Sequence, residues 1–178
     1  PSISRGAVID KRDRAANCCA ANYGFYLGAT NDNLEAVKSV DPSLTCGVKI
    51  FMGASTGNML VDDQTTLEGI FAATDLLVAT HCENTPMILQ AEADAAAKWG
   101  EDIPFQEHPN IRSEDACYAS SSLAVGLARK YGTKLHVLHL TTAKEMELFD
   151  IGPLENKRIT AEACVHHLIF SADDYAER

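Results

Sequence analysis

The sequence predicts an α/β fold with a parallel sheet, because strand-like and helix-like segments alternate along its 178 residues. Two further observations narrow the architecture. No Gly-rich phosphate-binding turn follows any predicted strand, which argues against an open nucleotide-binding sheet. Neither end of the chain carries a clear first or last element. We therefore expect five consecutive units of a (β/α)8 TIM barrel, which typically needs roughly 250 residues. An open doubly wound sheet is the alternative.

The first half of the chain is expected to carry two strands and two helices. A strand is expected within 18–30. A helix should follow it, because Asp32 and Glu35 have the three-residue spacing of a capping box. The second strand is expected within 47–55, where the run GVKIFMGAS is mostly apolar. The next helix is expected over 65–74, where Thr and Glu again have the capping spacing.

The second half continues the alternation. A third strand is expected within 75–83. Thr85 as N-cap, Pro86 in the first turn and Gly100 past the end bracket the helix that follows. Another helix is expected over 113–132, with acidic residues in its first turn and basic residues in its last.

The remaining elements are a fourth strand within 133–142, a helix opened by Thr142 and Glu145, and a fifth strand within 157–170. The opening residues PSISRG contain no convincing element. Both ends look like cuts inside a longer protein, so residues 1–178 are expected to be the central part of a single barrel domain.

Composition excludes several function classes. The net charge of −10 disfavours nucleic acid as a partner, because an acidic surface repels phosphates. No apolar stretch is long enough for a membrane span, and no signal peptide is recognisable. Six cysteines without a CxxC pair predict free thiols, several of them buried, in a reducing cytoplasm, and a cysteine zinc site is disfavoured. The expected partner is a small-molecule substrate, and a homodimer is left open.

Three polar residues stand within or at the ends of apolar strands. Lys49 lies in GVKIFMG, His81 follows LLVAT, and His139 follows LHVL. Each alone is more simply a hydrogen-bonded histidine or a lysine paired with a carboxylate. However, all three approach the carboxyl ends of their strands, where parallel α/β folds place their active sites. Together they predict one shared site.

A lysine can bridge two metal ions only if its amine is first converted into an anionic group with oxygen donors. Burial and nearby cations lower the pKa of such a lysine below about 10.4. The neutral amine of Lys49 can then add carbon dioxide, and the carbamate has two oxygens that can bridge two metal ions. Imidazoles from His81 and His139 with carboxylate-like oxygens suit zinc, although other divalent ions also fit.

The other histidines are expected to be less central. His136 and His139 differ by three positions, so in a regular strand they point to opposite faces, and we favour His139 for the site. His166 and His167 are adjacent late in the fifth strand and should also face oppositely. They are interpreted as packing or supporting groups, with a direct role left open. His108 lies in a polar loop and is expected on the surface.

The runs KIFMGASTGNMLV, THCEN and LHVLHLTT, in this order, resemble the dihydroorotases of the amidohydrolase superfamily. The resemblance extends from NYGFYLGATNDN to ITAEACVHHL and is greatest to bacterial enzymes with a carboxylated lysine. It implies an incomplete (β/α)8 barrel of the metal-dependent hydrolase type, covering roughly strands three to seven. It also implies the reversible cyclisation of N-carbamoyl-L-aspartate to L-dihydroorotate in pyrimidine biosynthesis.

Carried over by motif, the resemblance makes Lys49 the carboxylated ligand that bridges two zinc ions, and His81 and His139 the ligands of one ion. The family's H-x-H pair, substrate-binding arginine and catalytic aspartate have no counterpart in this sequence. The catalytic residue is therefore expected outside the chain, and residues 1–178 alone are expected to be inactive.

Three alternatives stay open. Hydantoinases, dihydropyrimidinases and allantoinases are similar cyclic amidohydrolases with the same lysine and strand-end histidines, although the run STGNML favours dihydroorotase. A non-catalytic homologue could serve as a scaffold for other pyrimidine enzymes, but the retention of Lys49, His81 and His139 argues against it. The last alternative is an α/β domain whose polar residues are unrelated.

Overall fold

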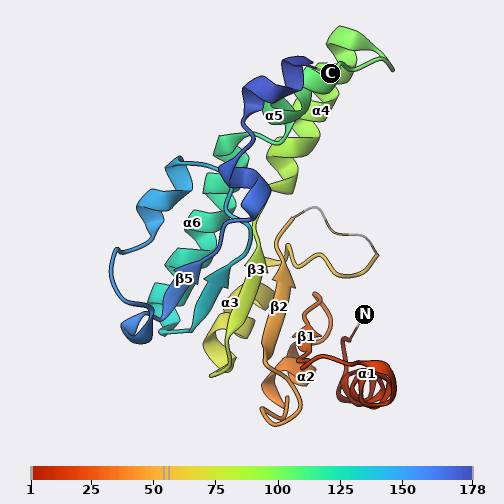
Figure 1. The fold of residues 1–178 in the computed structure, drawn as a ribbon, viewed down its shortest axis with the longest axis vertical. Coiled ribbons are helices and arrows are strands. Elements are labelled where there is room, and N and C mark those ends of the chain that lie inside the picture. Colours follow the sequence, from red (N-terminus) through yellow and green to blue (C-terminus); the bar gives the residue numbers. More distant parts are fainter. Residues whose placement is uncertain (1, 54, 56, 178) are drawn as a thin grey trace.

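A parallel five-stranded sheet forms the centre of the computed structural model, which describes residues 2–53, 55 and 57–177. The strands are β1 (Tyr26–Gly28), β2 (Gly47–Phe51), β3 (Val78–His81), β4 (Leu135–Val137) and β5 (Ile159–Ala161). Each strand pairs with the next strand along the chain, in the order β1-β2-β3-β4-β5 (Figure 1). A doubly wound sheet would reverse its strand order at a switch point. The uninterrupted order is that of an incomplete barrel, as the sequence predicts.

Helices connect the strands. The α-helices are α1 (Arg5–Cys18), α2 (Leu34–Lys38), α3 (Gln64–Ala73), α4 (Thr85–Trp99), α5 (His108–Ile111) and α6 (Glu114–Tyr131). Short 3-10 turns are η1 (Phe105–Glu107), η2 (Lys144–Leu148), η3 (Leu154–Asn156), η4 (Val165–Leu168) and η5 (Ala172–Glu177). The Tyr175 ring packs against Phe105 in a tilted arrangement, with centroids 4.9 Å apart, and stacks with His108 at 5.6 Å. The C-terminal turn therefore lies beside η1 and α5 (Figure 1).

One face of the sheet packs against helices and forms the core. Val48 and Ile50 of β2 are fully buried, whereas Lys49 and Phe51, which alternate with them, are only half-buried. The core continues into α3 through residues such as Ile70 and into α6 through residues such as Val125. Because side chains alternate across a strand, Lys49 lies on the face opposite this core.

Helix caps explain where the longer helices begin and end. The Asn84 side chain accepts a hydrogen bond from the backbone N–H of Met87 at 3.1 Å, so the N-cap of α4 is Asn84 and not Thr85. In the same way, Asp63 is the N-cap of α3, and its side chain accepts a hydrogen bond from the backbone N–H of Thr66 at 2.7 Å. Gly132 ends α6 with φ of +67°, a left-handed conformation that favours glycine.

The N-terminal region differs most from the sequence-based expectation. The strand expected within 18–30 is only Tyr26–Gly28, because only these residues pair with β2. Residues 19–25 belong to neither a helix nor a strand, and the helix before them, α1, was not predicted. Within α1 only Val8 and Ala15 are buried, so the helix has no apolar stripe to reveal it. The proposed capping box at Asp32 is also wrong, because α2 begins at Leu34 without a side-chain cap.

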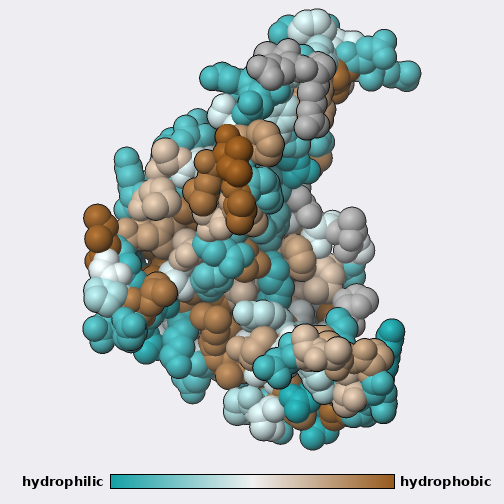
Figure 2. Space-filling model, viewed as in Figure 1, coloured by the Kyte–Doolittle hydropathy of each residue, from teal (hydrophilic) through white to brown (hydrophobic). Residues whose placement is uncertain are grey.

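The C-terminal third is less regular than expected. The Thr142 hydroxyl donates to Glu145 Oε2 at 2.8 Å and accepts from the Glu145 backbone N–H at 3.4 Å. The segment that follows is a 3-10 helix whose N-cap is Ala143, not the expected helix opened by Thr142. The fifth strand is confined to Ile159–Ala161. Figure 2 shows hydrophobic side chains gathered over the segment that follows. The exposed large hydrophobic residues of this segment are Val165, Leu168, Ile169 and Phe170.

The described part of the chain holds no helix that is both long and apolar enough to cross a membrane.

Candidate metal centre at the strand ends

The three predicted ligands come from three neighbouring strands. Lys49 is in β2, His81 is the last residue of β3, and His139 follows β4 by two residues. In the sheet register Lys49 pairs with Ala79, two residues before His81, so Lys49 and His81 share one face.

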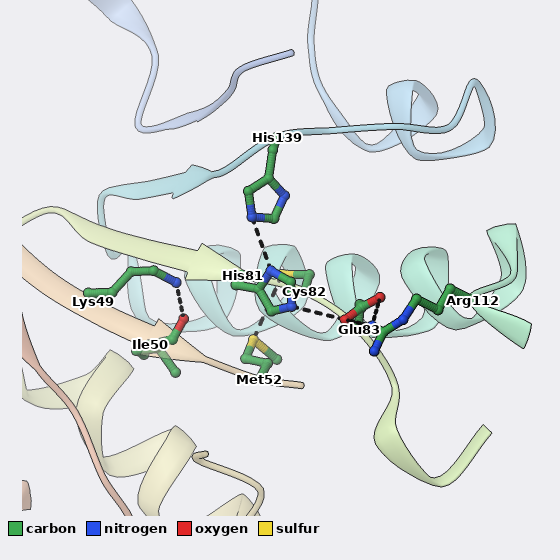
Figure 3. A network of polar contacts seen from close by, with 8 residues as sticks. All are labelled: Lys49, Ile50, Met52, His81, Cys82, Glu83, Arg112 and His139. Atoms are coloured by element: carbon green, nitrogen blue, oxygen red, sulfur yellow. Dashed lines mark hydrogen bonds and ion pairs between the residues drawn. The ribbon is translucent and has the colours of Figure 1, made fainter. Parts of the chain in front are cut away.

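His81 and His139 lie in direct contact. His81 Nδ1 and His139 Nε2 are 3.0 Å apart, and one of these nitrogens donates a hydrogen bond to the other (Figure 3). His139 has a φ of +43°, and it is the one described non-glycine residue with a positive φ. Such a backbone is uncommon and is often found at functional sites. Here it occurs just beyond the end of β4, next to His81.

The second nitrogen of His81 contacts a carboxylate. His81 Nε2 is 3.0 Å from Glu83 Oε2, and Arg112 Nη1 donates to both Glu83 oxygens at 2.7 Å (Figure 3). Burial acts to raise the pKa of Glu83, but the hydrogen bonds from His81 and Arg112 and the charge of Arg112 outweigh it and lower the pKa to about 2. Glu83 is therefore ionised at neutral pH.

Lys49 is isolated from carboxylates in the described structure. Its amine donates to the Ile50 carbonyl at 2.9 Å and lies 3.8 Å from the centre of the Phe51 ring. Burial lowers the pKa of Lys49 from 10.5 to about 8. This confirms the expected direction, and it makes a much larger fraction of the amine neutral at pH 7 than in an exposed lysine.

Burial is also the main factor that lowers the pKa of His139, followed by the nearby charge of His81. Lys49 contributes in the same direction, as does His167. The His139 imidazole is thus favoured in its neutral form, which is the form that binds metal ions.

The spacing of the two imidazoles fits a metal ion. Zinc binds histidine nitrogen at about 2.0–2.1 Å in tetrahedral geometry, which holds two ligand atoms about 3.3 Å apart. The observed 3.0 Å between His81 Nδ1 and His139 Nε2 is close to this value. The pair also borders a cavity of about 90 Å³ that reaches Cys117 and Glu145.

His136 corrects the expectation that it faces away from the site. It pairs in register with Ala79 and so shares the face of Lys49. The prediction of opposite faces assumed a regular strand up to His139, but β4 ends at Val137 and the positive φ turns the chain. His136 contacts Thr160 Oγ1 at 2.8 Å and a Glu162 oxygen at 3.2 Å.

The remaining histidines lie elsewhere. His166 and His167 belong to the turn η4 and not to a strand, which corrects their expected placement. Together with Cys164 they form a group whose ligand atoms lie within 4.8 Å of one another. His167 Nδ1 is also 3.2 Å from the Leu140 carbonyl oxygen. His108 is exposed, as expected, and stacks near Tyr175.

All six cysteines are free thiols, but only Cys82 is fully buried, and three of the others are exposed. The expectation of several buried thiols is therefore too broad.

Glu83 and Arg112 were missed by the motif-based reasoning. The signal for Glu83 was its position two residues after His81, which keeps it on the same side of the chain in an extended segment. No sequence signal joins it to Arg112, which is 29 positions away.

Known proteins resemble this chain at low identity over almost all of its length. No family model matches it. An allantoinase from Bacillus velezensis is 23% identical over 181 residues, and a dihydroorotase from Methanosarcina acetivorans is 26% identical over 185 residues. An L-hydantoinase from Paenarthrobacter aurescens is also 26% identical over 185 residues. These matches cover 98–100% of this chain but only 38–39% of each relative.

Solved structures agree on the fold. The L-hydantoinase (dihydropyrimidinase) from Arthrobacter aurescens superposes with a TM-score of 0.88 at 22% identity, covering 99% of this chain and 40% of that one. A D-hydantoinase superposes with a TM-score of 0.79 at 21% identity, covering 99% of this chain and 39% of that one. The comparisons support the cyclic amidohydrolase superfamily for this chain. They do not distinguish dihydroorotase from the other cyclic amidohydrolases, and the chain spans about two fifths of its relatives.

Proposed function

We propose that this chain provides one half of the metal centre of a cyclic amidohydrolase, and that the protein acts on dihydroorotate. The observation that carries the proposal is the 3.0 Å contact between His81 Nδ1 and His139 Nε2 at the ends of neighbouring strands. The named relatives, which include a dihydroorotase, support the reaction class. In this proposal carboxylated Lys49 would bridge two zinc ions. We also propose that the protein is located in the cytoplasm.

Each ligand has a defined part in this proposal. His81 and His139 would hold one ion with neutral imidazole nitrogens. Lys49 is half-buried, and its lowered pKa leaves part of the amine neutral at pH 7. The neutral amine attacks carbon dioxide, a nitrogen–carbon bond forms, and one proton leaves the nitrogen for solvent. The product is an anionic carbamate with two oxygen donors. Bound metal ions would supply an activated water and polarise the amide carbonyl.

The choice of substrate rests on the sequence run STGNML, which begins at Ser55. Thr56 in this run, and Ala54 just before it, lie outside the described residues. Allantoin and hydantoins are the alternative substrates, because an allantoinase and an L-hydantoinase resemble the chain as well as a dihydroorotase does. All three are cyclic amides, so the same metal chemistry serves each of them.

The test is a comparison of substrates with the zinc-loaded full-length protein, because residues 1–178 alone are expected to be inactive. Hydrolysis is measured for dihydroorotate, allantoin, hydantoin and dihydrouracil under identical conditions. We expect the highest kcat/KM for dihydroorotate, and His81→Ala and His139→Ala should each abolish most of it. A higher kcat/KM for allantoin or hydantoin would overturn the substrate assignment. Full activity in both histidine variants would overturn the metal centre itself.

A further inference from the structure

We propose that Glu83 and Arg112 are a positioning pair that holds His81 in the tautomer whose Nδ1 is free to bind a metal ion. This inference rests on the proposed function, because it concerns the same histidine. It extends that function by two residues outside the predicted ligand set.

The two nitrogens of His81 have different partners. An ionised carboxylate can only accept hydrogen bonds, so the 3.0 Å contact between Glu83 Oε2 and His81 Nε2 requires the proton on Nε2. The neutral ring then has its lone pair on Nδ1, which is the nitrogen that faces His139. Metal-binding histidines commonly donate their other N–H to a carboxylate in this way, which sets the tautomer and the orientation of the ring.

Arg112 holds the carboxylate in place. Its Nη1 donates to both Glu83 oxygens at 2.7 Å, and these charge-assisted hydrogen bonds restrict rotation of the carboxylate. The Glu83 side chain is 10% exposed and that of Arg112 is 36% exposed, so the pair is only partly screened by solvent. The chain Arg112, Glu83, His81, His139 is continuous in Figure 3.

The backbone around Glu83 is also constrained. A side chain at Gly53 would place its Cβ only 2.3 Å from the Glu83 carbonyl oxygen, so the end of β2 approaches Glu83 as closely as glycine permits. On the other side, the N–H of Asn84 donates to the Ala116 carbonyl of α6 at 3.1 Å. The backbone at Glu83 is therefore constrained on both sides, which suits a residue that orients the ring of His81.

The variant Glu83→Gln separates this role from a simple ion pair. The amide has a single oxygen, and the charged Arg112 is the stronger donor for it. The amide NH2 then faces His81 Nε2 and favours a lone pair there, so the ring proton moves to Nδ1. Arg112→Lys keeps the charge but replaces the rigid guanidinium, whose Nη1 reaches both Glu83 oxygens, by a flexible ammonium, and it should shift the tautomer only in part. Glu101→Gln is the matched control, because Glu101 is exposed.

Two measurements on the folded protein test the proposal. The first is ¹H–¹⁵N NMR of the His81 ring in the metal-free protein at neutral pH. The second is zinc affinity by competition with a chromophoric chelator. We expect an Nε2–H tautomer in the native protein and an Nδ1–H tautomer in Glu83→Gln. Zinc affinity should fall about 10- to 100-fold in Glu83→Gln, fall less in Arg112→Lys, and stay unchanged in Glu101→Gln.

The two proposals can fail separately. A native Nδ1–H tautomer, or an unchanged tautomer in both Glu83→Gln and Arg112→Lys, would overturn the positioning role even if the protein hydrolyses cyclic amides. Unchanged zinc affinity in Glu83→Gln would also overturn it. Conversely, the tautomer switch with the expected loss of zinc affinity supports the positioning role even if no cyclic amide is hydrolysed.

Discussion

Replacing Lys49 by methionine should stabilise the metal-free protein, although it should remove the bridging ligand. The pKa of Lys49 lies at about 8 instead of 10.5. At about 1.36 kcal/mol for each tenfold change, this corresponds to about 3.4 kcal/mol of preference for the neutral amine. Because the side chain is only half-buried, solvent screening reduces the cost of the charge to about half of this value. The contact with the Phe51 ring offsets about 0.5–1 kcal/mol more.

The expected net gain for Lys49→Met at pH 7 is about 1 kcal/mol, or about 2–4 °C in Tm for a chain of this size. The size of this gain depends on pH. The pKa of Lys49 is lower in the folded state, so the cost of its charge is fully present below pH 8. It is relieved as the pH rises from about 8 to 10.5, where the unfolded state binds more protons. The advantage of the variant should therefore shrink at pH 9.5.

The assay is thermal and urea unfolding at pH 7 and pH 9.5, after chelation of metal ions and in buffer free of carbon dioxide. Lys134→Met is the control, because Lys134 is exposed and adjoins β4. The same gain at both pH values would refute the reasoning, as would a loss of more than 1 kcal/mol at pH 7. Either result would mean that the buried amine is stabilised by a partner and carries no desolvation cost.

Three further predictions follow from the site and the caps. At a fixed concentration of dissolved carbon dioxide, the rate at which the protein incorporates labelled carbon should rise about tenfold per pH unit and level off above about pH 8; a rise that continues to pH 10 would contradict the lowered pKa of Lys49. His136→Ala should lose about 1 kcal/mol of stability through its hydrogen bond to Thr160 but keep zinc binding, and a metal titration in which it behaves like His139→Ala would make it a ligand. Asn84→Ala should lower the free energy of unfolding by about 1 kcal/mol in urea melts, and an unchanged value would show that the α4 cap is dispensable.

Local sequence patterns were sufficient to predict the parallel sheet. Alternating apolar runs and capping residues identify five strands, and parallel strands bring their carboxyl ends to one edge. From their positions alone, Lys49, His81 and His139 were predicted to share one end of the sheet. The structure brings His81 and His139 into contact at the strand ends, whereas Lys49 lies in the middle of β2. The same reasoning missed α1, because a helix with two buried residues carries almost no hydrophobic period.

Tertiary structure decided the atoms that face one another. His81 presents Nδ1 and not Nε2 to His139 because Glu83 occupies the other nitrogen, and Glu83 is held by an arginine 29 positions away. His136 faces the site side of the sheet through its register with Ala79, and His139 lies on that side as well because β4 ends two residues before it, where φ becomes positive. Pairings across loops and departures from regular strand geometry depend on the packing of distant segments. A local periodicity holds no information about such packing, so these features became visible only in the folded chain.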